Sequence, residues 1–195
     1  MNYLAHLYLS HHDVGLLVGN FIGDHVANKD LAVLPQSICS GVEMHRAIDQ
    51  FTDTHPITRQ LRSSLFDDYR HRSRVIVDLF YDHFLAKHWN IFSAMPLPEY
   101  ALHCYKVLKS FEEYLPESSS RYLEAMHRYR WLEAYQTIDG LESILILMSQ
   151  RTRYSSNLET GGKMLLDQYS LYENYFFEFF PDLKNHVSLT IESYA

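Results

Sequence analysis

Apolar residues recur at intervals of three and four positions along most of the chain, which is the period of an amphipathic α-helix. From this pattern we predict helices at 13–27, 36–53, 57–70, 73–92, 98–114, 119–137, 140–150 and 163–180. Proline lacks the N–H group that a helix interior needs, and all six prolines lie between or at the ends of these segments: Pro35, Pro56, Pro96, Pro98, Pro116 and Pro181. The pattern therefore predicts an all-α fold.

Turn-forming residues are too scarce for a protein made of many short strands, because the chain has only 7 glycines and 6 prolines. We find no repeat and no linker, so we predict one compact helical bundle that spans residues 1–195. Aromatic residues at helical spacing mark the last predicted helix: Tyr169, Tyr172, Tyr175, Phe176, Phe179 and Phe180. We expect this stripe to pack in the core rather than to bind a ligand.

Composition narrows the class of protein. The 195 residues are 47% hydrophobic and 21% charged, which is enough to build a packed core. No apolar run approaches the ~18 residues of a membrane span, and the first residues lack the basic start of a secretory signal. The two cysteines, Cys39 and Cys104, form no motif with each other. We therefore expect a cytoplasmic protein without membrane association.

Charge is distributed unevenly along the chain. The net charge of -7 argues against a general nucleic-acid binder, whose affinity depends on neutralising phosphates. The segment 59–74, however, contains five arginines and two aspartates and has a net charge of +3. The arginines are Arg59, Arg62, Arg70, Arg72 and Arg74. This segment is either a solvated helix face or a docking site for an anionic partner.

Three glycines, Gly15, Gly19 and Gly23, are spaced four residues apart. Each glycine inside a helix costs roughly 1 kcal/mol relative to alanine. We interpret the spacing as close packing between two helices, or as a helix that breaks near Gly19, rather than as direct ligand contact. Either arrangement brings backbone close to Asp24, which follows directly.

Potential ligands are concentrated in the first half of the chain, since nine of 12 histidines and nine of 12 aspartates lie at or before residue 88. In the segment 41–56, His45 and Asp49 are four residues apart and share one helix face. They form either a functional pair or a weak surface pair. Arg46 lies about a quarter turn away and is a candidate for phosphate contact.

A second cluster lies in the segment 75–89. Asp78 and Asp82 are four residues apart on an otherwise apolar helix face, where carboxylates are costly unless they are paired or bind a cation. A buried Asp–Arg pair is the structural alternative. His83 points about 100° further round, so it shares a pocket with Asp82 only if the pocket wraps the helix. We take His88 as a core histidine.

Together these segments predict a metal site built from three helices: Asp24, His45, Asp49, Asp78, Asp82 and His83. Carboxylates and imidazoles without thiolates favour Mn²⁺, Fe²⁺ or Mg²⁺ over structural zinc. The chain has no GxSxG, phosphate-cradling glycine loop or CxxC motif, so nucleophilic catalysis by serine or cysteine has no support.

Four segments of the first 90 residues resemble the acyl carrier protein phosphodiesterase family: NYLAHLYLS at 2–10, GNFIGD at 19–24, MHRAIDQFTD at 44–53 and DLFYDHFLAKHW at 78–89. The resemblance implies an HD-like helical hydrolase that cleaves the phosphodiester between 4'-phosphopantetheine and a serine of holo-acyl carrier protein. It also implies a divalent metal, preferably Mn²⁺. In the HD superfamily two adjacent motif residues occur in the order His-Asp, whereas this chain has the reverse order, Asp82-His83.

From this resemblance, we expect Asp24, His45, Asp49, Asp78 and Asp82 either to bind the metal or to contact the residues that bind it. His83 is expected to be a ligand or the acid that protonates the departing serine oxygen. His6 and Arg46 are candidates for phosphate contact, although a packed histidine is the preferred interpretation of His6.

Other functions fit parts of the pattern. An HD-like phosphohydrolase that acts on a nucleotide or another small phosphate ester is the first alternative. A carboxylate-bridged di-iron protein is disfavoured, because its paired Glu-x-x-His pattern is absent. A helical interaction module would bind no metal, and substitution of Asp82 would then affect stability alone.

Overall fold

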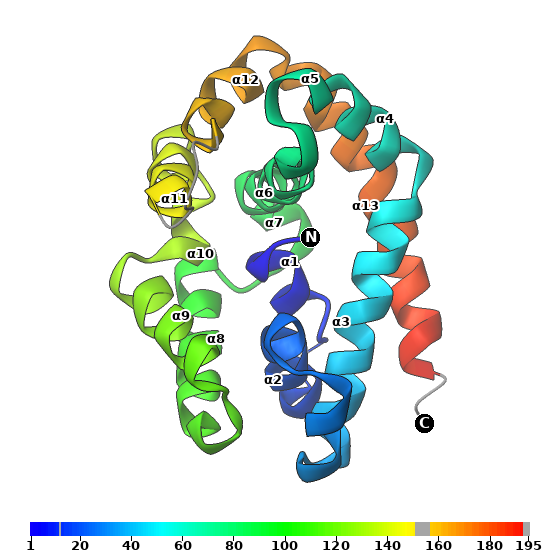
Figure 1. Ribbon diagram of the computed structural model, residues 1–195, viewed down its shortest axis with the longest axis vertical. Helices are drawn as coiled ribbons and strands as arrows, with labels where there is room; N and C mark the ends of the chain where they lie inside the picture. Colours follow the sequence, from blue (N-terminus) through cyan, green and yellow to red (C-terminus); the bar gives the residue numbers. More distant parts are fainter. Residues whose placement is uncertain (12, 151–156, 193–195) are drawn as a thin grey trace.

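The computed structural model describes residues 1–11, 13–150 and 157–192, and within these ranges it contains helices and turns without a β-strand (Figure 1). The predicted all-α fold is therefore confirmed. None of the described helices combines the length and the apolar character needed to cross a membrane.

Thirteen α-helices and five 3₁₀-helices are present in the described residues. The α-helices are α1 (Tyr3–Tyr8), α2 (Val14–Ile22), α3 (Gln36–Thr54), α4 (Pro56–Ser64), α5 (Phe66–Tyr69), α6 (Ser73–Lys87), α7 (Trp89–Phe92), α8 (Leu97–Ser110), α9 (Glu117–Arg128), α10 (Trp131–Ala134), α11 (Ile138–Gln150), α12 (Gly161–Asp167) and α13 (Tyr169–Glu192). The 3₁₀-helices are η1 (Gly23–His25), η2 (Asn28–Val33), η3 (Arg70–Arg72), η4 (Glu112–Tyr114) and η5 (Leu158–Thr160).

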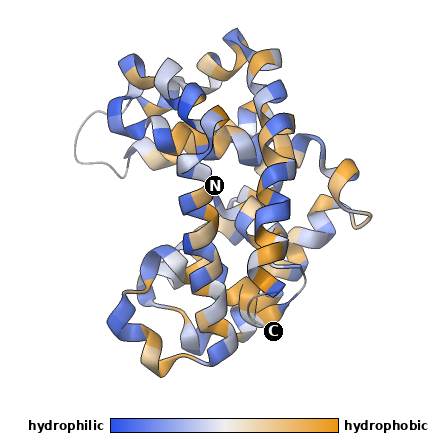
Figure 2. Cartoon of the chain, turned by 90° about the vertical axis from the view of Figure 1, so that its right-hand side faces the viewer, coloured by the Kyte–Doolittle hydropathy of each residue, from blue (hydrophilic) through white to orange (hydrophobic). Residues whose placement is uncertain are grey.

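Helices α1 and α6 lie at the centre of the molecule, between α3 with α13 on one side and α8 with α9 on the other (Figure 1). Most of the surrounding helices carry hydrophilic and hydrophobic residues along the same ribbon, as amphipathic helices do (Figure 2). Helix α6 is instead buried over most of its length, from Ile76 to Ala86 apart from Asp78. A central helix of this kind carries its polar residues into the interior.

The aromatic stripe of the last helix packs in the core, as predicted. Phe176, Phe179 and Phe180 are fully buried. The Phe179 ring stacks on Tyr81 of α6 with a centroid distance of 4.6 Å. These contacts explain why α13 continues through Pro181 to Glu192, whereas we predicted that the proline ends the helix. Burial of residues on both sides of Pro181 compensates for its missing N–H group.

Several predicted helices are interrupted, including 163–180, which divides into α12 and α13 at Gln168. The segment 13–27 is helical only to Ile22 before it tightens into η1, and the segment 73–92 divides into α6 and α7 at His88. The segment 119–137 divides at Arg130, whose φ of 51° is left-handed. Helix α1 was not predicted, because six residues are too few to establish a period.

The glycine spacing reflects close packing of α2 along α3. A Cβ atom on Gly19 would lie 2.0 Å from the Ile38 carbonyl oxygen and 2.7 Å from the Gly41 Cα atom. A Cβ atom on Gly23 would lie 2.2 Å from Cγ of His45. The helix does not break at Gly19, and its end at Ile22 lets Gly23 make room for the imidazole.

We predict that Gly19→Ala destabilises the protein by about 3 kcal/mol, the upper range for overpacking a tight interface. The obstructing atoms at Gly19 are backbone, which cannot move aside. At Gly161, by contrast, an added Cβ would meet the ends of the Ile76 and Leu145 side chains. Urea unfolding should therefore show a clearly smaller decrease in the free energy of unfolding for Gly161→Ala than for Gly19→Ala. Equal losses in the two variants would contradict this explanation of the spacing.

Candidate metal centre

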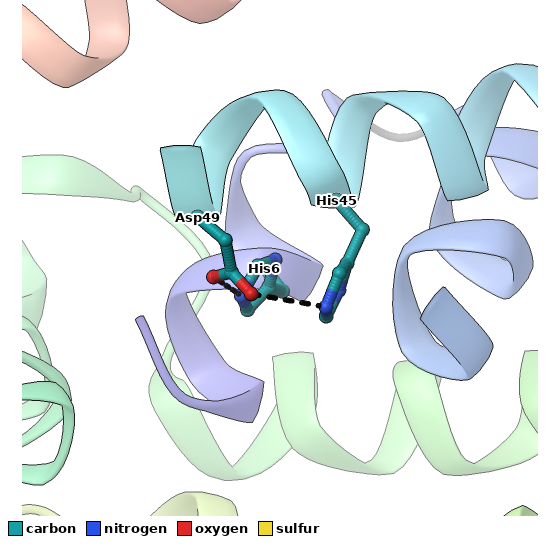
Figure 3. A group of neighbouring side chains, drawn as sticks. All are labelled: His6, His45 and Asp49. Atoms are coloured by element: carbon teal, nitrogen blue, oxygen red, sulfur yellow. Dashed lines mark ion pairs between the residues drawn. The ribbon is translucent and has the colours of Figure 1, made fainter. Parts of the chain in front are cut away.

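Three side chains from two helices converge beside the N-terminal segment. His6 lies on α1, and His45 and Asp49 lie on adjacent turns of α3 (Figure 3). One ligand atom from each lies within 4.8 Å of the others. The two imidazole rings stack with a centroid distance of 4.1 Å. The predicted pair on α3 thus gains a third partner from a helix that the sequence pattern did not reveal.

Local structure explains how His6 reaches this position. Asn2 caps α1 by accepting a hydrogen bond from the Tyr3 N–H at 2.8 Å, which starts the short helix. Asp82 on α6 then accepts the N–H groups of Leu4 at 2.7 Å and Ala5 at 3.3 Å. These are among the first N–H groups of α1, which have no partner within the helix. Asp82 therefore ties α1 to the centre of the molecule.

The two histidines present the same nitrogen to Asp49. His45 Nδ1 donates to the carbonyl oxygen of Asn20 at 2.8 Å, and its Nε2 lies 3.2 Å from Asp24 Oδ1 and 3.4 Å from Asp49 Oδ2. His6 Nδ1 donates to Asn20 Oδ1 at 2.7 Å, and its Nε2 lies 3.3 Å from Asp49 Oδ1. Histidine ligands of metals are typically held in this way, with one ring nitrogen bound to the protein and the other directed at the ion.

Burial and mutual hydrogen bonds shift the pKa values of all three side chains of the cluster. Burial lowers the pKa of His6 to about 4. Burial also disfavours the charged form of His45, but the hydrogen bonds to Asp24 and Asp49 outweigh it and raise the pKa of His45 to about 9. Burial likewise opposes ionisation of Asp49, yet the bond from His45 keeps the pKa of Asp49 well below its usual value.

The donor set fits a divalent cation. When neutral His6 carries its proton on Nδ1, where Asn20 Oδ1 accepts it, the Nε2 lone pair faces the Met1 carbonyl oxygen at 3.2 Å and Asp49 Oδ1 at 3.3 Å, and neither oxygen offers it a proton. A cation among His6 Nε2, His45 Nε2 and Asp49 would satisfy all three atoms. Two imidazoles with one carboxylate form a ligand set that suits Mn²⁺ or Fe²⁺.

The cluster opens into a pocket of about 330 Å³. Its lining includes the polar side chains of His6, His45, Asp24 and Asp78 and the largely apolar side chains of Tyr3, Tyr122, Trp131 and Met148. The Asp24 side chain is 72% exposed, which places this carboxylate at the mouth of the pocket. The pocket thus combines charged groups with apolar and aromatic side chains in its lining.

The second predicted carboxylate cluster is divided between two positions. Asp78 lines the pocket and accepts a hydrogen bond from the Met1 nitrogen at 3.0 Å, and burial raises its pKa. Asp82 is fully buried behind α1, and burial raises its pKa to about 7. Asp78 therefore faces the cluster, whereas Asp82 contacts the backbone of α1, the helix that carries His6.

Two predicted catalytic residues lie elsewhere. His83 Nδ1 donates to the Tyr135 carbonyl oxygen at 2.8 Å, and its Nε2 lies 2.9 Å from the Tyr169 hydroxyl oxygen. Arg46 donates through Nη2 to the Val26 carbonyl oxygen at 3.1 Å, so it holds the turn after Asp24. Their assignment to phosphate contact or acid catalysis remains a prediction that this geometry does not support.

The arginine segment forms a second hollow, of about 650 Å³, lined by Asp53, Arg59, Arg62, Ser63, Phe66, Arg70, His71, Ser73 and Arg74. Arg62 and Arg74 both pair with Asp53. Asp53 lies one turn after Asp49 on α3, and Arg74 lies one turn before Asp78 on α6. The basic hollow therefore adjoins the metal cluster along both helices. Arg72 is not among its lining residues.

Comparisons with known proteins indicate one family for the chain. A protein-family model described as acyl carrier protein phosphodiesterase matches residues 1–183. A relative in Enterobacter sp., named acyl carrier protein phosphodiesterase, is 31% identical over 93% of this chain and 94% of its own length. Relatives with the same name in Escherichia coli and Yersinia pestis are 31% and 30% identical, over 96% and 94% of this chain and 98% and 95% of their own lengths.

No solved structure matches the chain, so its relation to HD-domain proteins remains a prediction. The family model covers the helices that carry His6, Asp24, His45, Asp49 and Asp78. The resemblance seen in four short segments thus extends over nearly the whole chain, which belongs to the acyl carrier protein phosphodiesterase family.

Proposed function

We propose that the chain is a metal-dependent hydrolase that cleaves the phosphodiester between 4'-phosphopantetheine and a serine of holo-acyl carrier protein. Membership of the family supports the substrate. The observation that carries the metal dependence is that His6 and His45, both held through Nδ1, direct Nε2 at Asp49.

His6, His45 and Asp49 would hold the cation, with Asp24 and Asp78 beside it. We favour Mn²⁺, with Fe²⁺ or Mg²⁺ as alternatives. When bound, a divalent cation neutralises phosphoryl oxygens and acidifies a water molecule. Asp24, exposed at the pocket mouth, would accept a hydrogen bond from the attacking water.

The reaction adds one water molecule across the phosphodiester. Water forms a bond to phosphorus, the bond between phosphorus and the serine oxygen breaks, and that oxygen takes a proton. The products are apo-acyl carrier protein and free 4'-phosphopantetheine. Tyr3, Tyr122, Trp131 and Met148 also line the pocket, and their largely apolar side chains suit the uncharged part of the pantetheine arm.

The substrate is tested by incubating the wild-type protein with holo-acyl carrier protein and Mn²⁺. We expect the mass of the carrier protein to fall by the mass of the phosphopantetheine group. A hydrolase that acts on nucleotides or other small phosphate esters would leave the carrier protein unchanged. Hydrolysis of such esters without any change in the carrier protein would therefore replace the proposed substrate by the alternative.

The basic hollow is the proposed docking site for the carrier protein. Acyl carrier proteins are acidic, and this chain has a net charge of -7, so the two repel unless a basic surface faces the partner. The hollow supplies that surface with Arg59, Arg62, Arg70 and Arg74 beside the metal cluster. Asp53 neutralises part of the charge of Arg62 and Arg74, so the exposed Arg59 and Arg70 are the main free contributors.

We predict that Arg59→Glu combined with Arg70→Glu raises KM for holo-acyl carrier protein about tenfold and changes kcat by less than about twofold, because exposed charges act mainly on association. Steady-state kinetics at several salt concentrations measure both values. The matched control is Lys106→Glu with Arg128→Glu, which reverses two exposed charges on α8 and α9. A larger rise of KM in this control would move the docking site to that face.

A further inference from the structure

Asn20 contacts both histidines of the metal cluster although it is itself almost completely buried, with 1% of its surface exposed. Its side-chain Oδ1 accepts a hydrogen bond from His6 Nδ1 at 2.7 Å, and its backbone carbonyl accepts one from His45 Nδ1 at 2.8 Å. One residue of α2 therefore orients an imidazole from α1 and an imidazole from α3.

The orientation of the Asn20 amide is determined by its other contacts. Nδ2 donates to the His6 carbonyl oxygen at 2.6 Å and to Ser10 Oγ at 3.3 Å. A carbonyl oxygen can only accept, so the amide nitrogen has to face it and Oδ1 has to face the ring. Asn20 therefore contacts both the backbone and the ring of His6.

This contact selects the tautomer of His6. An acceptor at Nδ1 stabilises the form with the proton on Nδ1, and the Nε2 lone pair is then directed at Asp49. Without the acceptor, the proton would be more stable on Nε2, where the Met1 carbonyl oxygen at 3.2 Å and Asp49 Oδ1 at 3.3 Å are alternative acceptors. That tautomer cannot coordinate a cation through Nε2.

We propose that Asn20 is a positioning residue that prepares His6 for metal binding by holding it in the Nδ1–H tautomer. The close packing of Gly19 on α3 assists, because it brings the Asn20 carbonyl within reach of His45. The metal part of this proposal rests on the proposed function. The tautomer part can be tested in the metal-free protein.

The first measurement is the tautomer of His6, read from long-range ¹H–¹⁵N correlation spectra of metal-free protein labelled at histidine, at mildly alkaline pH. The His6 signals are assigned by their loss in His6→Gln. We expect the proton on Nδ1 in the wild type and on Nε2 in Asn20→Ala. Asn20→Leu, which fills the same space without an acceptor, provides the same test if the alanine variant does not fold.

The second measurement is the affinity for Mn²⁺ alone, followed by electron paramagnetic resonance. Loss of a residue that orients a histidine ligand typically weakens metal binding about 10- to 100-fold, and we expect a change of this size for Asn20→Ala. The matched control is Ser10→Ala, which removes the other partner of the Asn20 amide nitrogen but leaves Oδ1 on His6. It should change neither the tautomer nor the affinity.

The outcomes separate this proposal from the proposed function. If the wild type binds no Mn²⁺ but Asn20→Ala moves the His6 proton, the metal site fails and the role of Asn20 in orienting His6 stands. If the His6 proton stays on Nδ1 in both Asn20→Ala and Asn20→Leu, Asn20 is not the residue that sets the tautomer and the proposal is overturned.

Discussion

Asp49→Asn is expected to lower kcat/KM for holo-acyl carrier protein by about a thousandfold, which corresponds to about 4 kcal/mol of transition-state stabilisation. Both histidines direct Nε2 at this carboxylate, so it supplies the negative charge of the cluster. An amide keeps the shape of the side chain but cannot neutralise a divalent cation. Affinity for Mn²⁺, measured by titration of the metal-stripped protein, should fall together with turnover.

The matched control is Glu43→Gln, which makes the same change of charge at an exposed position of the same helix. Circular dichroism should show intact helices in both variants, and Glu43→Gln should retain the wild-type rate. An Asp49→Asn variant that is fully active with Mn²⁺ would remove Asp49 from the proposed site.

The second large effect distinguishes two histidines. We expect His6→Gln to reduce turnover about a thousandfold, because it removes a ligand atom that faces Asp49. His83→Gln is expected to keep kcat within a few-fold of the wild type, because His83 bonds to Tyr135 and Tyr169 instead. Initial rates with holo-acyl carrier protein and saturating Mn²⁺ measure both effects.

The sequence prediction that His83 is a ligand or the catalytic acid requires the opposite result. Loss of turnover in His83→Gln, with wild-type activity in His6→Gln, would support that prediction and contradict the site described above. Thermal unfolding of each variant shows whether a loss of activity reflects loss of the fold.

The helical fold and the site residues on α3 were predictable because both follow from local spacing. His45 and Asp49 are one turn apart on one helix, so their side chains meet whatever the rest of the chain does. Likewise, three glycines at intervals of four residues pointed to the close packing that the structure shows between α2 and α3.

His6 was a candidate for phosphate contact but was not selected as a metal ligand, because its position beside His45 and Asp49 depends on contacts between distant segments. Helix α1 is too short to show a period, and its position is set by Asp82 on α6 and by Asn20 on α2. The available signal was Asn2, which is a good helix cap directly before an apolar segment that contains a histidine.

The roles of Asp82 and His83 likewise depend on contacts with segments outside α6. Carboxylates on an apolar face were correctly recognised as needing a partner. For Asp82 that partner is a pair of backbone N–H groups of α1, which no spacing within α6 can reveal. His83, about 100° further round α6, faces Tyr135 instead.

Metal dependence of carrier-protein hydrolysis is tested most directly by mass spectrometry of holo-acyl carrier protein after incubation with metal-stripped protein, with and without added Mn²⁺. We expect no change in mass without metal, and with Mn²⁺ a loss equal to the phosphopantetheine group. Release of phosphopantetheine at the full rate by the metal-stripped protein, in the continued presence of chelator, would contradict a metal centre formed by His6, His45 and Asp49.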